Sequence, residues 1–473
     1  MFRTLALTLT IAASPVALAA SSWHGQIIYQ VMPDRFANGD LSNDFDTDRA
    51  DLRAWHGGDL KGLTDRLGYI KSLGATAVWL TPVYTQVRAT QGGARGYHGY
   101  WPQDFRNVDP HFGTLNDFKA FTAAARSSGL KVMLDQVVNH TGPGAPLTYE
   151  KPQWFHNPAT CLNLGNKDVN CPIYDLPDLA QERPDVRAFL FENADFWRSL
   201  GVDAFRYDAI KHVPSDFLRD LLKHDAQQGT FTIGEYYGAD AGIIADYQKL
   251  GFHSLFDFAL QEAMQGSIMG GGGLSTVRAT LERAREVPDP DSVALFLDNH
   301  DVPRFANGTL FEDVGRARTT YGLRALLTLR GIPVIWQGTE IAMRGGHDPD
   351  NRRDMRFPES WTAEERASFN AAKAAIQVRK DSKALSLGDQ KLVTVPDAFA
   401  DDLLLFTREH GGERVLVAWH GGRARRTYSV RNDLVPSMSI VRDLYAQDAK
   451  ASFRGGFLHV SLPPQTAAVF RLP

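Results

Sequence analysis

The chain has 473 residues, of which 43% are hydrophobic and 22% are charged. This length and composition are typical of a folded protein of two or three domains. The formal net charge is −4 with mixed signs, so we expect no nucleic-acid partner. We also expect a monomer. No membrane partner is expected, because no segment is long and apolar enough to span a bilayer.

Residues 1–20 have the pattern of a secretory signal peptide. Arg3 supplies the positive charge, residues 5–13 form a short apolar stretch, and residues 17–19 (Ala-Leu-Ala) match a cleavage site. The mature protein is therefore predicted to begin at Ala20 or Ser21 and to be secreted or periplasmic.

A helical stretch that ends at glycine and leads into an apolar run recurs four times, at residues 72–80, 128–135, 199–206 and 329–336. Glycine ends helices because it accepts positive φ, and a continuous apolar run suits a strand buried on both faces. Further strand candidates lie at residues 27–32, 230–235, 254–258 and 293–298. Eight strands that alternate with helices predict an α/β fold, a (β/α)8 TIM barrel whose active site lies at the C-terminal strand ends.

Two helix starts can be placed within this pattern. Thr114 and Asp117 have the spacing of a capping box with Asp in place of Glu. Pro184 stands where a first-turn proline would begin a helix that runs to Arg198.

Two stretches depart from the barrel pattern. Residues 141–183 are rich in Pro, Gly and Asn and are too long for an ordinary loop, so they predict a small excursion after the third strand. Residues 382–473 contain alternating apolar runs that predict a C-terminal antiparallel β-sandwich. The barrel then comprises residues 21–140 and 184–381.

The excursion contains the two cysteines of the chain, Cys161 and Cys171. In an oxidising compartment two nearby cysteines are predicted to pair. The alternative is a pair of free thiols.

Four segments begin as apolar runs and end in carboxylates, amides or imidazoles. They are residues 135–140, 201–212, 234–237 and 296–301. This is the pattern of buried strands that deliver polar side chains to one rim of the barrel. The rim would hold three carboxylates, Asp208, Glu235 and Asp301. Cleavage of a glycosidic bond with retention needs two carboxyl groups roughly 5 Å apart.

In these segments the chain resembles glycoside hydrolase family 13, the α-amylase family. A fifth segment at residues 176–179 (Leu-Pro-Asp-Leu) precedes the second, and residues 28–36, 57–60, 97–101 and 345–352 also match. The resemblance implies that Asp208 is the nucleophile, Glu235 the acid/base and Asp301 the residue that supports the transition state. The alternative for each is a salt-bridged structural carboxylate.

The resemblance also implies a set of substrate-binding residues. Arg206 would keep Asp208 ionised, Tyr100 would lie under the sugar beside the scissile bond, and Lys211 with His212 would frame the leaving side. Three histidines would hydrogen-bond the sugar beside the scissile bond: His98, His140 and His300. Asp348 and Arg352 would contact sugars further up the chain, and all of these residues could instead be structural.

Calcium is the cofactor that the resemblance implies, because hard oxygen donors suit Ca²⁺. Asn139, Asp178 and the backbone carbonyl of His212 match ligands that hold the excursion against the barrel. A second site, for which a plain polar turn is the alternative, would use Asn38, Asp40, Asn43, Asp44, Gly57 and Asp59.

The sequence therefore predicts a secreted α-amylase that hydrolyses internal α-1,4-glucosidic bonds of starch or maltooligosaccharides with retention. A maltogenic or cyclomaltodextrinase-like enzyme, or a 4-α-glucanotransferase, is the alternative. Residues 234–237 (Gly-Glu-Tyr-Tyr) depart from the commoner family versions, so Tyr236 or Tyr237 is expected on the acceptor side. The first strand follows closely on the predicted signal peptide, so we expect no N-terminal dimerisation domain. A non-catalytic glucan-binding protein is disfavoured because all three carboxylates are present.

Overall fold

The computed structural model describes residues 19–431 and 438–473. Residues 1–18 of the predicted signal peptide lie outside this range, so that assignment stays a prediction. Among the residues described, no helix combines the length and the apolar character needed to cross a membrane.

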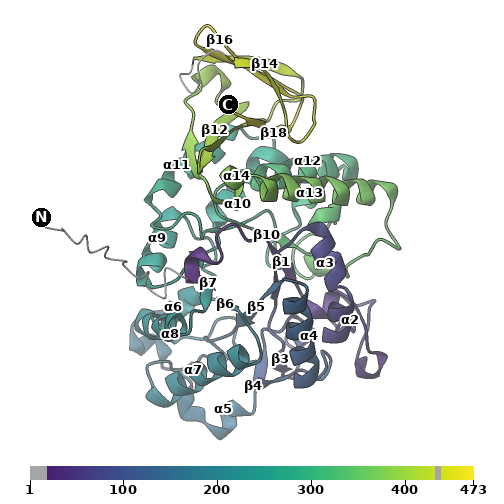
Figure 1. Ribbon diagram of the computed structural model, residues 1–473. Helices are drawn as coiled ribbons and strands as arrows, with labels where there is room; N and C mark the ends of the chain where they lie inside the picture. The colour runs from purple at the N-terminus through teal and green to yellow at the C-terminus, as the bar shows by residue number, and fades with distance from the viewer. Residues whose placement is uncertain (1–18, 432–437) are drawn as a thin grey trace, which may run out of the picture.

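The eight predicted strands form one parallel sheet, which is wrapped into a nearly closed barrel (Figure 1). Its strand order is β8-β7-β6-β5-β2-β1-β10-β9. The two end strands approach each other where Asp257 N donates to Ala294 O, at 3.0 Å. The strands are β1 (Ile28–Val31), β2 (Ala77–Leu80), β5 (Lys131–Gln136), β6 (Ala204–Tyr207), β7 (Phe231–Gly234), β8 (Ser254–Leu255), β9 (Ala294–Phe296) and β10 (Ile332–Trp336).

Helices follow the strands and cover the outside of the barrel (Figure 1). The predicted starts are confirmed, because Thr114 and Asp117 form a capping box and Pro184 occupies the first turn of its helix. The helices are α2 (Leu60–Asp65), α3 (Leu67–Leu73), α4 (Leu115–Ser127), α7 (Pro184–Ser199), α8 (Ser215–Gln227), α9 (Ala241–Leu250), α10 (Phe258–Met264), α11 (Leu274–Arg283), α12 (Glu312–Leu326), α13 (Ala363–Asp381) and α14 (Lys383–Leu387).

Glycine separates helix from strand as the sequence predicted. Gly74, Gly129, Gly201 and Gly331 have φ angles of 107°, 71°, 97° and 124°. A side chain at such an angle would strain the backbone. At each of these positions the next strand begins within one to three residues of the glycine.

The barrel has apolar side chains on both faces of its strands. Inside, Trp79, Met133 and Phe231 belong to a cluster of buried residues contributed by successive strands. Outside, alternate strand residues such as Val78 and Phe205 pack against the helices. Each large apolar side chain buried in this way contributes roughly 1.5–3 kcal/mol. The result is a rigid support for the polar groups at the strand ends.

An antiparallel hairpin that was not predicted lies between β2 and α4. It pairs β3 (Tyr84–Gln86) with β4 (Pro102–Val108) through an irregular register. β4 carries Asp104 and Arg106 and is only partly buried, so it lacks the apolar run that identified the barrel strands. The hairpin loop contains His98 and Tyr100.

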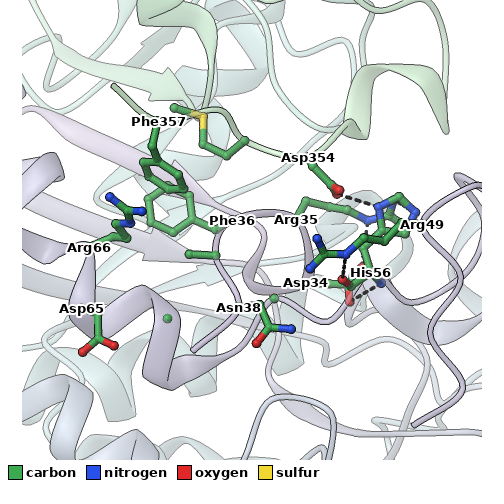
Figure 2. Close-up of a pocket in the computed structure, with 14 residues that line it drawn as sticks. Asp34, Arg35, Phe36, Asn38, Arg49, His56, Asp65, Arg66, Asp354 and Phe357 are labelled. Atoms are coloured by element: carbon green, nitrogen blue, oxygen red, sulfur yellow. Dashed lines mark hydrogen bonds and ion pairs between the residues drawn. The ribbon is translucent and has the colours of Figure 1, made fainter. Parts of the chain in front are cut away.

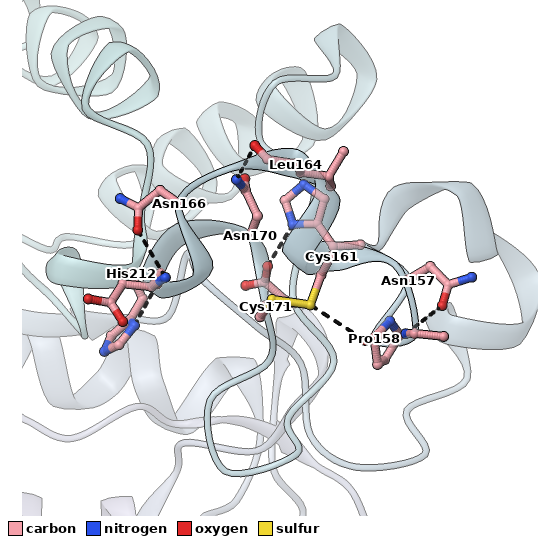
Figure 3. The surroundings of a disulfide bond; sticks show 12 residues. Asn157, Pro158, Cys161, Leu164, Asn166, Asn170, Cys171 and His212 are labelled. Atoms are coloured by element: carbon pink, nitrogen blue, oxygen red, sulfur yellow. Dashed lines mark hydrogen bonds and ion pairs between the residues drawn. A yellow bond between two sulfur atoms is a disulfide. The ribbon is translucent and has the colours of Figure 1, made fainter.

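The predicted excursion, residues 141–183, contains short helical segments. They are α5 (Leu147–Glu150), η4 (Pro152–Trp154), η5 (Cys161–Leu164) and α6 (Lys167–Asn170). The predicted disulfide between Cys161 and Cys171 is present (Figure 3). The exact limits of the excursion, and those of the other predicted domains, stay predictions.

The C-terminal region is the predicted antiparallel β-sandwich, at one end of the molecule (Figure 1). Buried residues such as Leu405, Leu416 and Val460 fill the space between its two sheets. The first sheet also contacts α11 and α12 of the barrel. The strands of the first sheet are β11 (Asp389–Leu392), β12 (Leu403–His410), β13 (Glu413–His420) and β18 (Thr466–Arg471), and those of the second are β14 (Arg426–Arg431), β15 (Met438–Arg442), β16 (Lys450–Arg454) and β17 (Phe457–Leu462).

Buried Arg379 on α13 joins that helix to the segment before β10. Its guanidinium donates to the carbonyls of Leu327, Leu329 and Gly331 at 2.7–2.8 Å. Arg379→Met would leave these carbonyls unpaired, so we expect the free energy of unfolding to fall by about 3 kcal/mol or more.

Urea unfolding of the purified variant would measure this loss. Lys373→Met, at an exposed position of the same helix, should change the free energy of unfolding by less than about 0.5 kcal/mol. Equal effects of the two substitutions would contradict the role given to Arg379.

Candidate active site

The strand ends open into a cleft of about 590 Å³. It contains the three predicted carboxylates, and Tyr174 and Leu176 of the excursion form part of its wall. Of the predicted substrate-binding residues, it is lined by His98, Tyr100, His140, Lys211, His212, His300, Asp348 and Arg352. The remaining predicted residue, Arg206, lies buried beneath them.

Arg206 is the centre of the site. Its side chain is 1% exposed, and Nη1 donates to Asp135 Oδ1 and to Asp208 Oδ1, both at 2.8 Å. Nη2 lies 3.4 Å from Glu235 Oε2. Burial alone would lower the pKa of Arg206, but the surrounding carboxylates outweigh it and raise that pKa well above its usual range. One fixed positive charge therefore bridges three carboxyl groups from β5, β6 and β7.

The turn after β6 ties Asp208 to Glu235. Ala209 adopts a left-handed conformation, with φ of 50°, and its N–H donates to Glu235 Oε2 at 3.0 Å. Burial raises the pKa of Glu235 to about 8, with Asp208 and Asp301 adding to the rise and Arg206 opposing it. Glu235 is thus held as a neutral acid beside Asp208.

Asp301 has the opposite electrostatic setting. Burial would raise its pKa, but His300, Arg352 and Arg206 together hold that pKa below its usual value. Arg352 Nη2 lies 3.3 Å from Asp301 Oδ1, and Arg352 Nη1 lies 3.0 Å from Asp348 Oδ1. Asp301 is therefore placed to carry a negative charge into the cleft.

Tyr100 is oriented by a chain of hydrogen bonds. Its hydroxyl donates to Asp135 Oδ2 at 2.8 Å and accepts from Nε2 of His300 at 2.7 Å. Gln30 Nε2 donates to the other ring nitrogen of His300 at 2.7 Å. Burial lowers the pKa of His300 to about 3, which agrees with a neutral ring. His300 therefore has bonds to protein at both nitrogens.

Two more of the predicted histidines, His98 and His140, contact the backbone of Tyr100. His98 Nδ1 accepts from Tyr100 N at 3.0 Å, and His140 Nε2 donates to Tyr100 O at 3.1 Å. Burial lowers the pKa of both imidazoles. His98 keeps Nε2 for other contacts, as a donor.

Exposed tyrosines flank the mouth of the cleft. Tyr174 is 87% exposed and Tyr237 is 60% exposed, and both line the cleft. Tyr236 instead packs against Tyr247, with ring centroids 5.5 Å apart. Of the two tyrosines that the sequence left open, Tyr237 is the one that reaches the cleft.

The first predicted calcium site has oxygen atoms that fit a cation. Asn139 Oδ1 and Asp178 Oδ1 are buried, and neither has a hydrogen-bond partner within the described structure. The two residues lie at one backbone bridge, where His140 pairs with Asp178. Buried oxygens without partners are rare in folded proteins, so this pair is suited to a hard cation.

The second predicted site has a different character. Asn38 Oδ1 and Asn43 Oδ1 are buried without partners in the described residues, and Asn38 Nδ2 donates to Asp44 at 2.7 Å. Gly57 packs close against Asp44, where a Cβ would lie 2.3 Å from Oδ1. Asp59, by contrast, accepts the backbone amides of residues 39, 40 and 62.

Asp40 is also engaged, because it caps the following turn through Ser42 N at 3.0 Å. Asn38 lies at the edge of a neighbouring cavity of about 520 Å³ lined by Arg35, His56 and Asp354 (Figure 2). Asn38 and Asn43 thus offer free oxygens to a cation, whereas Asp40, Asp44 and Asp59 already have protein partners.

Three residues of the site were missed by the sequence analysis. Asp135 was assigned no role, yet it holds both Arg206 and Tyr100. Its position at the end of an apolar strand was the available signal. Gln30 and Asp168 gave no signal, because their partners His300 and His212 are 270 and 44 residues away in the chain.

Comparison with known proteins agrees with this geometry. The family model of the α-amylase catalytic domain matches residues 30–157 and 169–392. A β/α-amylase of Paenibacillus polymyxa is 32% identical over 95% of this chain, which spans 38% of that protein. A cyclomaltodextrin glucanotransferase of Klebsiella oxytoca is 32% identical over 90% of this chain and 75% of its own length. The structure of an Anoxybacillus α-amylase has a TM-score of 0.86 at 34% identity, covering 95% of this chain and 98% of that chain.

The raised pKa of Glu235 predicts how stability depends on pH. Its pKa is about 8 in the folded protein against an ordinary value of 4.5, so the folded state binds this proton more tightly than the unfolded state. Between these values the folded form loses stability as pH rises. Glu235→Gln removes this loss, so the variant should gain stability relative to wild type between about pH 5 and about pH 8.

Urea unfolding at both pH values would measure the difference. Glu286→Gln, at an exposed position, serves as the control and should follow wild type. If Glu235→Gln changed the free energy of unfolding by the same amount at about pH 5 and about pH 8, the raised pKa assigned to Glu235 would be contradicted.

Proposed function

We propose, since the chain belongs to the α-amylase family of glycoside hydrolases, that it is a secreted α-amylase that cleaves internal α-1,4-glucosidic bonds with retention. The observation that carries the proposal is the Arg206 guanidinium, which contacts both Asp208 and Glu235. Two carboxyl groups that contact one guanidinium are close neighbours, and retaining glycosidases need a pair of carboxyl groups roughly 5 Å apart.

The proposed first step uses the two carboxyl groups differently. Asp208 attacks the anomeric carbon while the bond from that carbon to the glycosidic oxygen breaks. Glu235 gives its proton to the departing oxygen, as its raised pKa allows. A covalent glycosyl-enzyme remains on Asp208. Glu235, now ionised, then takes a proton from water, whose oxygen attacks the anomeric carbon and releases Asp208.

The neighbouring groups would stabilise the transition state. Asp301, whose pKa is held low, presents negative charge to the oxocarbenium-like sugar. Tyr100 offers its ring as a platform, because its hydroxyl is fixed by Asp135 and His300. His98 Nε2 can donate to a sugar hydroxyl. Such groups act without reorganisation because the protein already holds them.

Calcium would be held by Asn139, Asp178 and the carbonyl of His212, and less completely by the turn around Asn38, Asn43 and Asp44. When bound, it would cross-link the excursion to the barrel. Asp178 meanwhile keeps a hydrogen bond from His156 Nδ1 at 2.6 Å.

Export is supported by the disulfide, because such bonds persist in oxidising compartments. The pair Cys161 and Cys171 joins two points of a polar, largely exposed loop. Together with the predicted signal peptide, this favours a secreted or periplasmic enzyme.

A second candidate is transfer to a sugar in place of water, as in a 4-α-glucanotransferase. The specific observation is the pair of exposed rings, Tyr174 and Tyr237, that both line the cleft. Aromatic faces can retain a sugar long enough to compete with water. Relatives of both names, amylase and glucanotransferase, match this chain.

The proposed roles predict the effect of removing each carboxylate. Asp208→Asn should lower kcat on soluble starch by more than about 10⁴-fold, since no nucleophile remains. Glu235→Gln should lower it by about 10²- to 10⁴-fold, because only the proton donor is lost. Release of reducing ends measures both rates.

Asp246→Asn, on an exposed residue of α9, should behave as wild type. Wild-type activity in Asp208→Asn would refute the assignment. Analysis of the products from maltoheptaose then separates the two candidates, because products larger than the substrate indicate transfer.

The calcium proposal predicts a metal-dependent stability. Ca²⁺ at about a hundredfold excess over its Kd should stabilise the protein by about 2.7 kcal/mol, and a chelator should remove this gain. Asp178→Asn should weaken Ca²⁺ binding by about tenfold or more, because it takes away the charged ligand. Calorimetry with and without Ca²⁺ measures both effects, and identical curves for the chelated and loaded wild type would refute the site.

A further inference from the structure

The disulfide closes a loop that lies against the cleft. Cys161 and Cys171 are joined, and the loop between them contains α6. This helix contacts η6 (Ile210–His212), the turn that carries two of the predicted substrate-binding residues. Figure 3 shows His212 beside the loop closed by the disulfide.

One residue of the loop contacts both of those side chains. Asp168 O lies 2.7 Å from Nδ1 of His212, and Asp168 Oδ2 lies 3.7 Å from Nζ of Lys211. A carbonyl oxygen can only accept a hydrogen bond, so Nδ1 of His212 carries the hydrogen. In the neutral ring Nε2 is then an acceptor. No hydrogen bond to Nε2 is formed by the described residues, and His212 lines the cleft.

The loop is held mainly by its own bonds. Asn166 Oδ1 accepts from Asp168 N at 3.0 Å, and Asn170 Nδ2 donates to Leu164 O at 3.0 Å. Leu162 and Leu164 are 69% and 55% exposed, so the loop buries little apolar surface. A short segment with so little burial cannot offset the entropy of its own ordering. The disulfide lowers the entropy that the chain loses when the loop becomes ordered, so it is the interaction that fixes the position of Asp168.

We propose that residues 161–171 act as a clip that makes Asp168 a positioning residue for the leaving side of the cleft. The clip fixes His212 with Nε2 as an acceptor toward a hydroxyl of the sugar beyond the scissile bond, and it draws Lys211 to the same wall. This inference rests on the proposed function. It assigns the clip an effect on binding of the leaving sugar and none on the carboxylates that break the bond.

Two substrates separate these effects. Maltoheptaose places a sugar against His212, whereas α-maltosyl fluoride has fluoride as its leaving group and places none there. In Cys161→Ser/Cys171→Ser, kcat/KM on maltoheptaose should fall about 3- to 10-fold, mainly through KM, as expected for one misplaced hydrogen bond. The rate on α-maltosyl fluoride should stay within about twofold of wild type.

Asn166→Ala provides a milder variant that keeps the disulfide and removes the bond to Asp168 N. Its KM on maltoheptaose should also rise. This variant replaces the double cysteine variant if that protein does not fold. Asp246→Asn, at an exposed position of α9, is the control and should leave the rates on both substrates unchanged.

A double-mutant cycle identifies the route of the effect. If the clip acts through His212, then His212→Ala combined with Cys161→Ser/Cys171→Ser should lose no more on maltoheptaose than His212→Ala alone. Additive losses, equal losses on both substrates, or an unchanged KM would overturn the inference. If the wild type cleaved neither substrate, the proposed function itself would be refuted.

Discussion

The buried guanidinium of Arg206 is the interaction on which the rest of the site depends. It binds Asp135 and Asp208 at 2.8 Å and approaches Glu235 at 3.4 Å. A charge buried without partners would cost several kcal/mol, so the barrel can hold Arg206 only where these carboxyl groups converge. The convergence is itself a consequence of parallel strands, because β5, β6 and β7 end at one rim.

The same guanidinium helps to set opposite protonation states within one cleft. Burial raises the pKa of Glu235 to about 8 and that of Asp135 to about 7, against the pull of Arg206. Asp301 lies close to Arg352 as well as to His300, and these groups hold its pKa low. Arg206 and Arg352 therefore do not lower the pKa values of the surrounding carboxyl groups equally. A neutral acid and a charged carboxylate can therefore coexist in one cleft, and the neutral acid is the proton donor that a retaining glycosidase needs.

Much of this arrangement could be predicted from local sequence, and the remainder depends on contacts that local patterns do not record. The eight strands, the capping box at Thr114 and the pairing of Cys161 with Cys171 were predicted, because each rests on neighbouring residues. The β3–β4 hairpin was missed because pairs of polar residues separate the apolar residues of β4, which gives neither an apolar run nor a strict alternation. The bridging role of Asp135 was missed because Arg206 lies 71 residues away and only strand pairing brings the two together.

The floor and the walls of the cleft have different physical origins, and this bears on the proposed choice between water and a sugar as acceptor. The carboxyl groups of the floor follow buried strands and are fixed by short hydrogen bonds. The walls come from loops: Tyr174 has a positive φ of 50° and an exposed ring, and Asp168 lies in a loop closed by a disulfide. Loops vary more readily than the elements they connect. The relatives of this chain carry both names, amylase and glucanotransferase. The proposed choice between water and sugar would then lie with the walls, to which Tyr174, Tyr237 and His212 contribute.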